Sequence, residues 1–215
     1  HDPAVIALLG TPSLAIPGGG RDHALDTLEA SVPAPLLAPH HEALVKDLEE
    51  RPGTSAFYVV AKAKPRDMKA RVDAVAALPR WSSEEAAAVA KAALGDTAIE
   101  QRFAEAFVAT REPKEKMRLA GVLGRIGTAG AQAALASELR TDVVYEMPGA
   151  LRRSVRLDVV AALSKSFPEE KSLWDNAIAG DEGYARVEAL VEARFGITWK
   201  TARPPYLTIQ GFPSP

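Results

Sequence analysis

The amino-acid sequence predicts an all-α protein: a short α-solenoid of stacked antiparallel helix pairs, with an irregular N-terminal segment and a C-terminal tail. Three observations lead to this prediction: the distribution of proline, the spacing of residues that begin and end helices, and a recurring motif that starts with arginine. The expected organisation is an irregular Pro/Gly-rich segment over 1–40, a helical-repeat domain over 41–196, and a tail over 197–215 that packs as a cap.

Proline concentrates at the two ends of the chain. Eight of the sixteen prolines lie in residues 1–65 and four more in 196–215. The four that fall between these ends are Pro79, Pro113, Pro148 and Pro168. A helix interior tolerates proline poorly, whereas the start of a helix and the position after its end accept it. The middle of the chain is therefore expected to be helical, with these prolines at the helix boundaries.

The N-terminal part has weaker signals. Residues 11–20 and 31–39 are rich in proline and glycine, which predicts loop or extended backbone. A helix is expected over 41–50, because it follows Pro39 and is closed by Arg51-Pro52-Gly53. Residues 54–63 fit either a short strand or a first packed helix.

Boundary residues divide the middle of the chain into helices. Three pairs have the spacing of a capping box: Ser82 with Glu85, Thr97 with Glu100, and Ser166 with Glu169. Glycines stand where helices should end, at Gly95, Gly127, Gly180 and Gly196. The predicted helices lie near 66–78, 83–94, 98–110, 114–126, 129–139, 149–164, 168–178 and 182–195.

The predicted helices also resemble one another in sequence. The stretch from Arg71 to Leu78 matches the stretch from Arg156 to Leu163 at six of eight positions. Looser copies begin at Arg118 and Arg186, so that successive arginines are 47, 38 and 30 residues apart. Intervals of this size are typical of stacked helix pairs. A plain Ala-rich helical bundle, whose helices look alike by composition, is the alternative.

One repeat resembles a known family. The stretch Lys116–Gly127, followed by Ala131-Gln132-Ala133-Ala134-Leu135, is similar to the HEAT-like (HEAT/PBS-lyase-type) repeats of bacteria. It has an early arginine, an Ala/Leu-rich face, an LG-x-I-G turn and a second helix that ends in leucine. The match is partial over 66–94 and 149–178, the period is uneven, and the helix at 98–110 has no partner. The resemblance implies an α-solenoid, commonly a protein-binding scaffold, and implies no catalytic residues.

Composition excludes several kinds of chemistry. The 215 residues carry 26 Lys and Arg against 28 Asp and Glu, whereas proteins that wrap nucleic acid usually have a basic excess. The absence of cysteine excludes disulfides and thiolate chemistry within the chain. No apolar stretch is long enough for a transmembrane segment. A cytoplasmic location and export with loss of a signal segment both stay open, since the chain begins at His1.

No set of residues predicts a catalytic, cofactor or metal site, and the protein is expected not to be an enzyme. His40-His41-Glu42 is the only dense group of possible metal ligands. Neighbouring helix residues point about 100° apart and do not chelate one ion. The histidines are therefore interpreted as two polar residues at the start of a helix. Gly18-Gly19-Gly20-Arg21 lacks the Gly-Lys-Ser/Thr of a phosphate loop.

Four residues are candidates for binding. Arg152 and Arg153 lie on the predicted helix 149–164, where Arg156 would be one turn from Arg152, and Arg140 closes the preceding helix. Such a patch would suit phosphates or an acidic partner. The favoured alternative is structural, because Arg156 occupies the repeat position that often bridges neighbouring HEAT-like repeats. Trp81 lies in a predicted turn after Pro79-Arg80 and is the tryptophan most expected to be exposed.

The function predicted from these features is a non-enzymatic scaffold that binds another protein, of unknown identity, on a concave face. The second helices of the repeats, near 83–94, 129–139 and 168–178, would line that face. The first alternative is nucleic-acid binding through the arginine patch. The second is lyase-like handling of a small molecule or chromophore, which some bacterial HEAT-like proteins suggest. The tail, which contains Trp199, would cover the end of the solenoid or dock on a partner.

Overall fold

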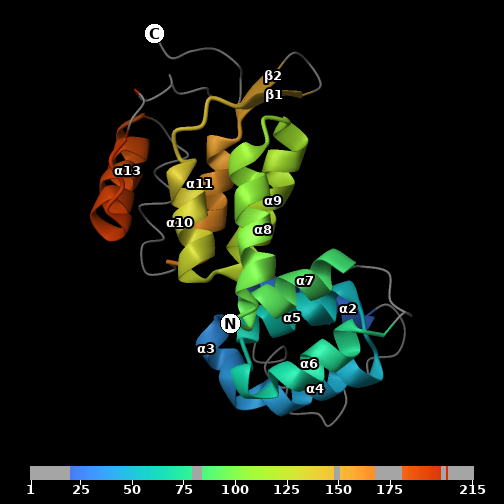
Figure 1. Ribbon diagram of the computed structural model, residues 1–215. Helices are drawn as coiled ribbons and strands as arrows, with labels where there is room; N and C mark the ends of the chain where they lie inside the picture. Colours follow the sequence, from blue (N-terminus) through green and yellow to red (C-terminus); the bar gives the residue numbers. More distant parts are fainter. Residues whose placement is uncertain (1–19, 79–83, 148–150, 168–180, 200–201, 203–215) are drawn as a thin grey trace. The chain divides into compact units, whose positions relative to one another are not determined.

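The computed structural model describes residues 20–78, 84–147, 151–167, 181–199 and 202 (Figure 1). These residues are mostly helical, as predicted, and they contain one two-stranded antiparallel sheet. The chain divides into two compact units, residues 1–100 and 101–215. Each unit is described separately.

The first unit is built from helices alone in its described part. Its elements are α2 (Gly20–Ser31), α3 (Ala34–Leu37), the 3-10 helix η1 (Ala38–His40), α4 (His41–Glu50), α5 (Thr54–Ala63), the 3-10 helix η2 (Arg66–Met68), α6 (Lys69–Ala76) and α7 (Glu84–Ala93). Helix α4 packs against α5 and α6, and α7 also packs against α5 and α6 (Figure 1). Helices α2 and α3 lie on α5. Residues 54–63 therefore form a packed helix.

The predicted irregular N-terminal segment is wrong from residue 20 onward, because α2 and α3 occupy most of 20–37. Helix α2 buries Ala24, Leu25 and Leu28 on the face that meets α5. This burial stabilises a helix that the local sequence signals favour only weakly. Proline does not prevent α3, since its proline lies in the first turn, where no backbone N–H is needed. Residues 1–19 lie outside the described part.

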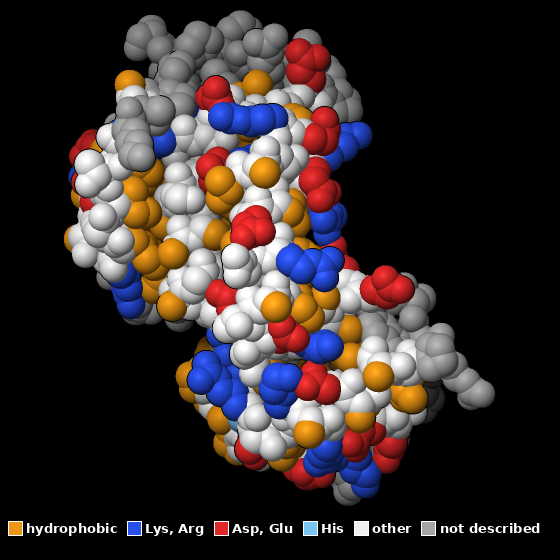
Figure 2. Space-filling view, viewed as in Figure 1, with side chains coloured by type: hydrophobic (Ala, Val, Ile, Leu, Met, Phe, Trp, Pro, Cys, Tyr) orange, Lys and Arg blue, Asp and Glu red, His pale blue; other side chains and the backbone are white. Residues whose placement is uncertain are grey.

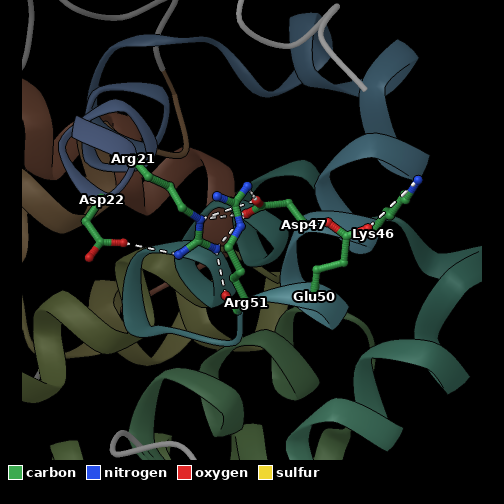
Figure 3. Close-up of polar contacts among 6 residues, drawn as sticks. All are labelled: Arg21, Asp22, Lys46, Asp47, Glu50 and Arg51. Carbon is green, nitrogen blue, oxygen red and sulfur yellow. Dashed lines mark hydrogen bonds and ion pairs between the residues drawn. The ribbon is translucent and has the colours of Figure 1, made fainter. Parts of the chain in front are cut away.

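A buried ion cluster joins α2 to α4 (Figure 3). The side chain of Asp47 on α4 is 3% exposed and accepts hydrogen bonds from Arg21 Nη2 and Arg51 Nη2, both at 2.6 Å. Arg21 Nη2 also donates to the carbonyl oxygen of Arg51 at 2.6 Å. A buried carboxylate is tolerated only when it is paired and hydrogen-bonded, and here two guanidinium groups meet that requirement.

Helix α8 (Thr97–Ala109) crosses the boundary between the two units and follows the predicted helix 98–110 closely. The predicted capping pair of Thr97 and Glu100 is wrong by one position. Asp96 caps the helix instead, because its Oδ1 accepts from Ile99 N at 3.1 Å. The preceding residue, Gly95, has φ +102°, a conformation that favours glycine and separates α7 from α8.

The second unit contains helices and a β-hairpin. Its remaining elements are α9 (Pro113–Ile126), α10 (Ala129–Ser137), β1 (Val144–Met147), β2 (Leu151–Ser154), α11 (Arg156–Ser164) and α13 (Asp181–Phe195). Helices α9, α10 and α11 pack side by side, and α13 packs on α10 (Figure 1). The helices predicted over 114–126, 129–139 and 182–195 are confirmed to within about two residues. The helix predicted over 168–178 lies outside the described part.

The helix predicted over 149–164 is wrong in its first third. Residues 151–154 form β2, which pairs antiparallel with β1, and the helix begins only at Arg156. The pairing places Tyr145 opposite Arg153 and continues through a hydrogen bond from Val155 N to Val143 O at 3.0 Å. The β-branched and aromatic residues that precede Pro148 supply the strand preference that overrides a helical continuation.

The LG-x-I-G stretch at the end of α9 has two separate structural roles. A Cβ added to Gly124 would lie 3.0 Å from the Cβ of Ala162, so glycine permits the close approach of α9 and α11. Gly127 has φ +55° and ends α9 as a left-handed C-cap, with its N–H donating to Leu123 O at 3.0 Å. The predicted helix end at Gly127 is therefore confirmed.

Lys116 is a fully buried cation in the core of the second unit. Its Nζ donates to the carbonyl oxygens of Phe107 at 2.9 Å and Thr110 at 3.2 Å, and it pairs with Glu138 Oε2 at 2.8 Å. The ammonium group also lies 4.9 Å from the centre of the Phe107 ring. Lys116 thus satisfies the open carbonyl groups at the end of α8 and ties that end to α9.

Candidate functional site

The candidate site is centred on Arg140, which follows α10. Its guanidinium group pairs with Glu188 of α13 through Nε–Oε1 at 2.8 Å and Nη2–Oε2 at 3.3 Å. The Glu188 side chain is 2% exposed, whereas that of Arg140 is 17% exposed. Two parallel hydrogen bonds to a buried carboxylate hold the plane of the guanidinium in one orientation.

An aromatic ring covers the guanidinium group. The ring of Trp199 lies with its centre 4.6 Å from Arg140 Cζ, a cation–π distance. Trp199 follows Gly196, which has φ +64° and ends α13. The indole N–H of Trp199 is buried and has no hydrogen-bond acceptor in the described part of the chain. The tail segment at 197–199 therefore rests on its own unit at this point, and most of the tail beyond it is outside the described residues.

A second arginine docks on the same face of α13. Arg156 is 2% exposed, donates from Nε to Ser154 Oγ at 3.1 Å, and has its Cζ 5.1 Å from the centre of the Tyr184 ring. The Tyr184 hydroxyl donates in turn to the carbonyl oxygen of Leu139. Tyr184 is one turn before Glu188, so α13 presents adjacent partners to Arg156 and Arg140.

The other predicted site residues do not join this group. Arg152 and Arg156 do not share a helix face, because Arg152 lies in β2, opposite Glu146, and Arg156 begins α11. Arg153, also in β2, pairs with Asp158 Oδ1 at 3.0 Å. Trp81 lies outside the described residues.

The pair of Arg153 and Asp158 sits in a partly buried polar environment beside the hairpin. Burial raises the pKa of the Asp158 carboxyl, and the Arg153 guanidinium lowers it in part. Burial and the nearby Asp158 charge raise the pKa of the Tyr145 hydroxyl. These groups give the hairpin a titratable contact with the start of α11.

Sequence reasoning singled out Arg140 but missed its partners. Glu188 lies 48 residues away in sequence, on a helix where glutamate is common, so no local pattern marks it. Tyr184 belongs to the apolar periodicity of α13, and that periodicity predicts burial but not its contact with an arginine.

Helix α10 carries small side chains on its open face. Its exposed residues are Ala129, Gly130, Ala133 and Ser137. Helix α7, which the sequence predicts as a second helix in the first unit, buries six of its ten residues. Helices α7 and α10 are the two described helices that are expected to line a binding face. Of these two, α10 has more exposed residues.

The histidine pair at 40–41 is built into the first unit. His41 Nε2 lies 2.9 Å from the carbonyl oxygen of Ala63, and Glu42 Oε2 pairs with Arg71 Nη1 at 2.8 Å. Among the described residues, no group of three or more His, Cys, Asp or Glu side chains is placed to hold a metal ion. None of the helices in the described ranges has the length and apolar character needed to cross a membrane.

Acidic and basic side chains are interspersed on the face of the molecule shown in Figure 2.

Comparisons with protein-family models, with curated proteins and with solved structures found no match to this chain.

Proposed function

We propose that this chain is a non-enzymatic helical-repeat scaffold that binds another protein on the open face of α10, next to Arg140. The order in which the helices stack carries the proposal. Stacked repeats form extended surfaces suited to protein partners, and the expected α-solenoid would supply such a surface.

The stacking order within the first unit supports a solenoid. Helices α4 and α5 are joined by three residues and pack together, and α6 packs with α7. The two pairs meet through α4 with α6 and through α5 with α7. An up-and-down bundle would instead make α5 and α6 main neighbours, since they are consecutive in the chain.

One of the four repeat arginines, Arg71, supports the same arrangement. Arg71 on α6 reaches the first helix of the preceding pair, where its Nη1 meets Glu42 and its Nη2 meets Glu49 Oε2 at 2.6 Å. A bridge between neighbouring repeats is the role that the resemblance implies for this position. In the second unit, the close approach of Gly124 to Ala162 brings the first helix of one pair against α11.

The charge pattern favours a protein partner over nucleic acid. Arg140, Arg153 and Arg156 all contact acidic, hydroxyl or aromatic side chains of their own unit. A phosphate-binding patch would need guanidinium groups directed at the ligand, and each such contact would add to the salt dependence of binding.

The test is capture from a lysate of the source organism with the tagged full chain, with and without nuclease. The discriminating variant is Ala133→Glu, which puts charge and bulk on the open face of α10. Ala106→Glu on exposed α8 is the matched control. The expected result is one discrete protein, captured by the wild type and the control in both samples and lost with Ala133→Glu.

Two results would reject the proposal. The first is a captured set that disappears with nuclease or with a modest rise in salt, which would favour nucleic acid. The second is equal capture by Ala133→Glu and the wild type, which would remove α10 as the binding face. Circular dichroism of both variants checks that the fold is retained.

A further inference from the structure

We propose that Arg140 and Glu188 form a binding site for a tryptophan side chain carried by an extended segment of a partner protein, and that Trp199 occupies this site in its absence. The tail would then regulate the binding face by competing with the partner for Arg140. The assignment of a partner protein to this site rests on the proposed function, whereas the affinity of the site for an indole does not.

Arg140 is held in one orientation by its pair with Glu188. Glu188 is buried and accepts two guanidinium N–H groups, so the plane of the Arg140 guanidinium is fixed. A planar cation held in this way offers its face to an aromatic ring, and tryptophan gives the strongest interaction of this kind. The ring of Trp199 at 4.6 Å shows that the site accepts an indole.

The contact between Arg140 and Trp199 leaves one polar group of the indole unsatisfied. The indole N–H is buried but has no acceptor in the described part of the chain. The penalty for an unsatisfied buried donor is comparable in size to the gain from a cation–π contact. The tail is therefore held weakly at this site. A segment that is free to place a backbone carbonyl group at the indole N–H would not carry this penalty.

A short connection joins Trp199 to the end of α13. Trp199 stands three residues after Gly196, and the intervening residues form no helix or strand. Gly196 tolerates a wide range of backbone angles. Release of Trp199 therefore requires a change of backbone angles in a short connection and leaves α13 and its contact with α10 intact.

The experiment measures fluorescence anisotropy of a labelled peptide with the sequence of residues 196–203, added to the full-length chain. We expect the Trp199→Ala chain to bind the peptide about tenfold more tightly than the wild type, because the internal competitor has been removed. A peptide with alanine in place of its tryptophan should not bind. Circular dichroism confirms that the Trp199→Ala chain is folded.

A second variant tests the part played by the guanidinium plane. Arg140→Lys, made in the Trp199→Ala chain, keeps a positive charge opposite Glu188 but removes the flat face, and peptide affinity should fall about tenfold. Arg118→Lys is the matched control, since Arg118 is an exposed arginine paired with Glu115 at 2.6 Å. Its affinity for the peptide should equal that of the Trp199→Ala parent.

Three outcomes would overturn the inference: equal affinity of the wild type and Trp199→Ala, no loss with Arg140→Lys, or equal binding of the alanine peptide. A wild-type dimer that dissociates in Trp199→Ala would replace the partner protein by a second copy of the chain. Failure of the Ala133→Glu capture experiment with success here would reject the proposed α10 face but keep the indole site.

Discussion

Gly124 of α9 and Ala162 of α11 approach so closely that a Cβ on the glycine would lie 3.0 Å from the alanine Cβ and 3.1 Å from its Cα. The contact joins α9, whose sequence resembles a HEAT-like repeat, to α11, and α10 lies between these two helices in the chain. Gly121, one turn earlier on the same helix, has no such neighbour, since an added Cβ would meet only Arg125 Nη1 at 3.6 Å.

The first prediction compares alanine at these two glycines. Both substitutions gain helix propensity, so the difference between them isolates the steric effect. The free energy of unfolding of Gly124→Ala should be lower than that of Gly121→Ala by about 1–3 kcal/mol, the usual cost of overpacking a core. Urea denaturation provides the measurement. Equal stability of the two variants would show that α9 and α11 are not tightly packed at this point.

The second prediction concerns Lys116. Replacement by methionine leaves Glu138 without its cation and the carbonyl groups of Phe107 and Thr110 without a donor. Lys116→Met should lower the free energy of unfolding by about 3 kcal/mol, as expected for a broken buried pair. Lys114→Met, on the exposed side of the same helix, should change it by less than about 0.5 kcal/mol. A similar result for both variants would contradict the structural role assigned to Lys116.

The sequence predicted best those features that depend on a few adjacent residues. Gly127 marks a helix end because only glycine adopts its left-handed conformation at little cost, and Pro113 marks a helix start because that position needs no N–H. Both effects are local. The helices bounded by such residues were therefore predicted to within a few positions.

Features that depend on distant contacts were not predicted. Helix α2 forms because Leu25 and Leu28 are buried against α5, although its own residues give little sign of a helix. The β-hairpin at 144–154 depends on pairing between two strands, and the second strand lies where the sequence pattern predicts the start of the helix 149–164. Lysine is usually exposed, so the sequence gives no sign that Lys116 is buried. Only the tertiary structure supplies its hydrogen-bond acceptors.

Of the candidate site, the sequence indicated Arg140, which a local signal marks, but not the partners that depend on distant contacts. Arg140 was recognised because it closes a helix in an arginine-rich region. The grouping with Arg152 and Arg153 assumed one continuous helix, and the hairpin separates them. The partner that defines the site, Glu188, is supplied by the packing of α13 on α10, and no pattern within either helix specifies that packing.

The third prediction concerns the ion cluster of the first unit. Asp47→Ala removes a carboxylate that is 3% exposed and leaves the half-buried Arg21 without its main partner. The free energy of unfolding should fall by about 3–5 kcal/mol. Glu50→Ala is the control on the same helix, where the pair with Lys46 is exposed and spans 3.9 Å, and its cost should not exceed about 0.5 kcal/mol. A loss below about 1 kcal/mol for Asp47→Ala would show that the cluster does not hold α2 in place.

The fourth prediction concerns the pH dependence of stability at Asp158. Burial raises the pKa of this carboxyl above its ordinary value of 3.8 in the folded chain, against the lowering effect of Arg153. Between the unfolded and the folded pKa, the folded state therefore binds more protons than the unfolded state. Stability due to this group falls as the pH rises through that window, and the loss is complete above the folded pKa.

Asp158→Asn removes the titration while keeping the size of the side chain. The difference in the free energy of unfolding, wild type minus variant, should decrease as the pH rises from 3.8 through the folded pKa, and should be constant above it. Urea denaturation at a series of pH values measures this difference. A difference that increases with pH would mean that the ion pair with Arg153 outweighs burial and lowers the pKa of Asp158. In that case the contact between the hairpin and α11 would be a stabilising ion pair.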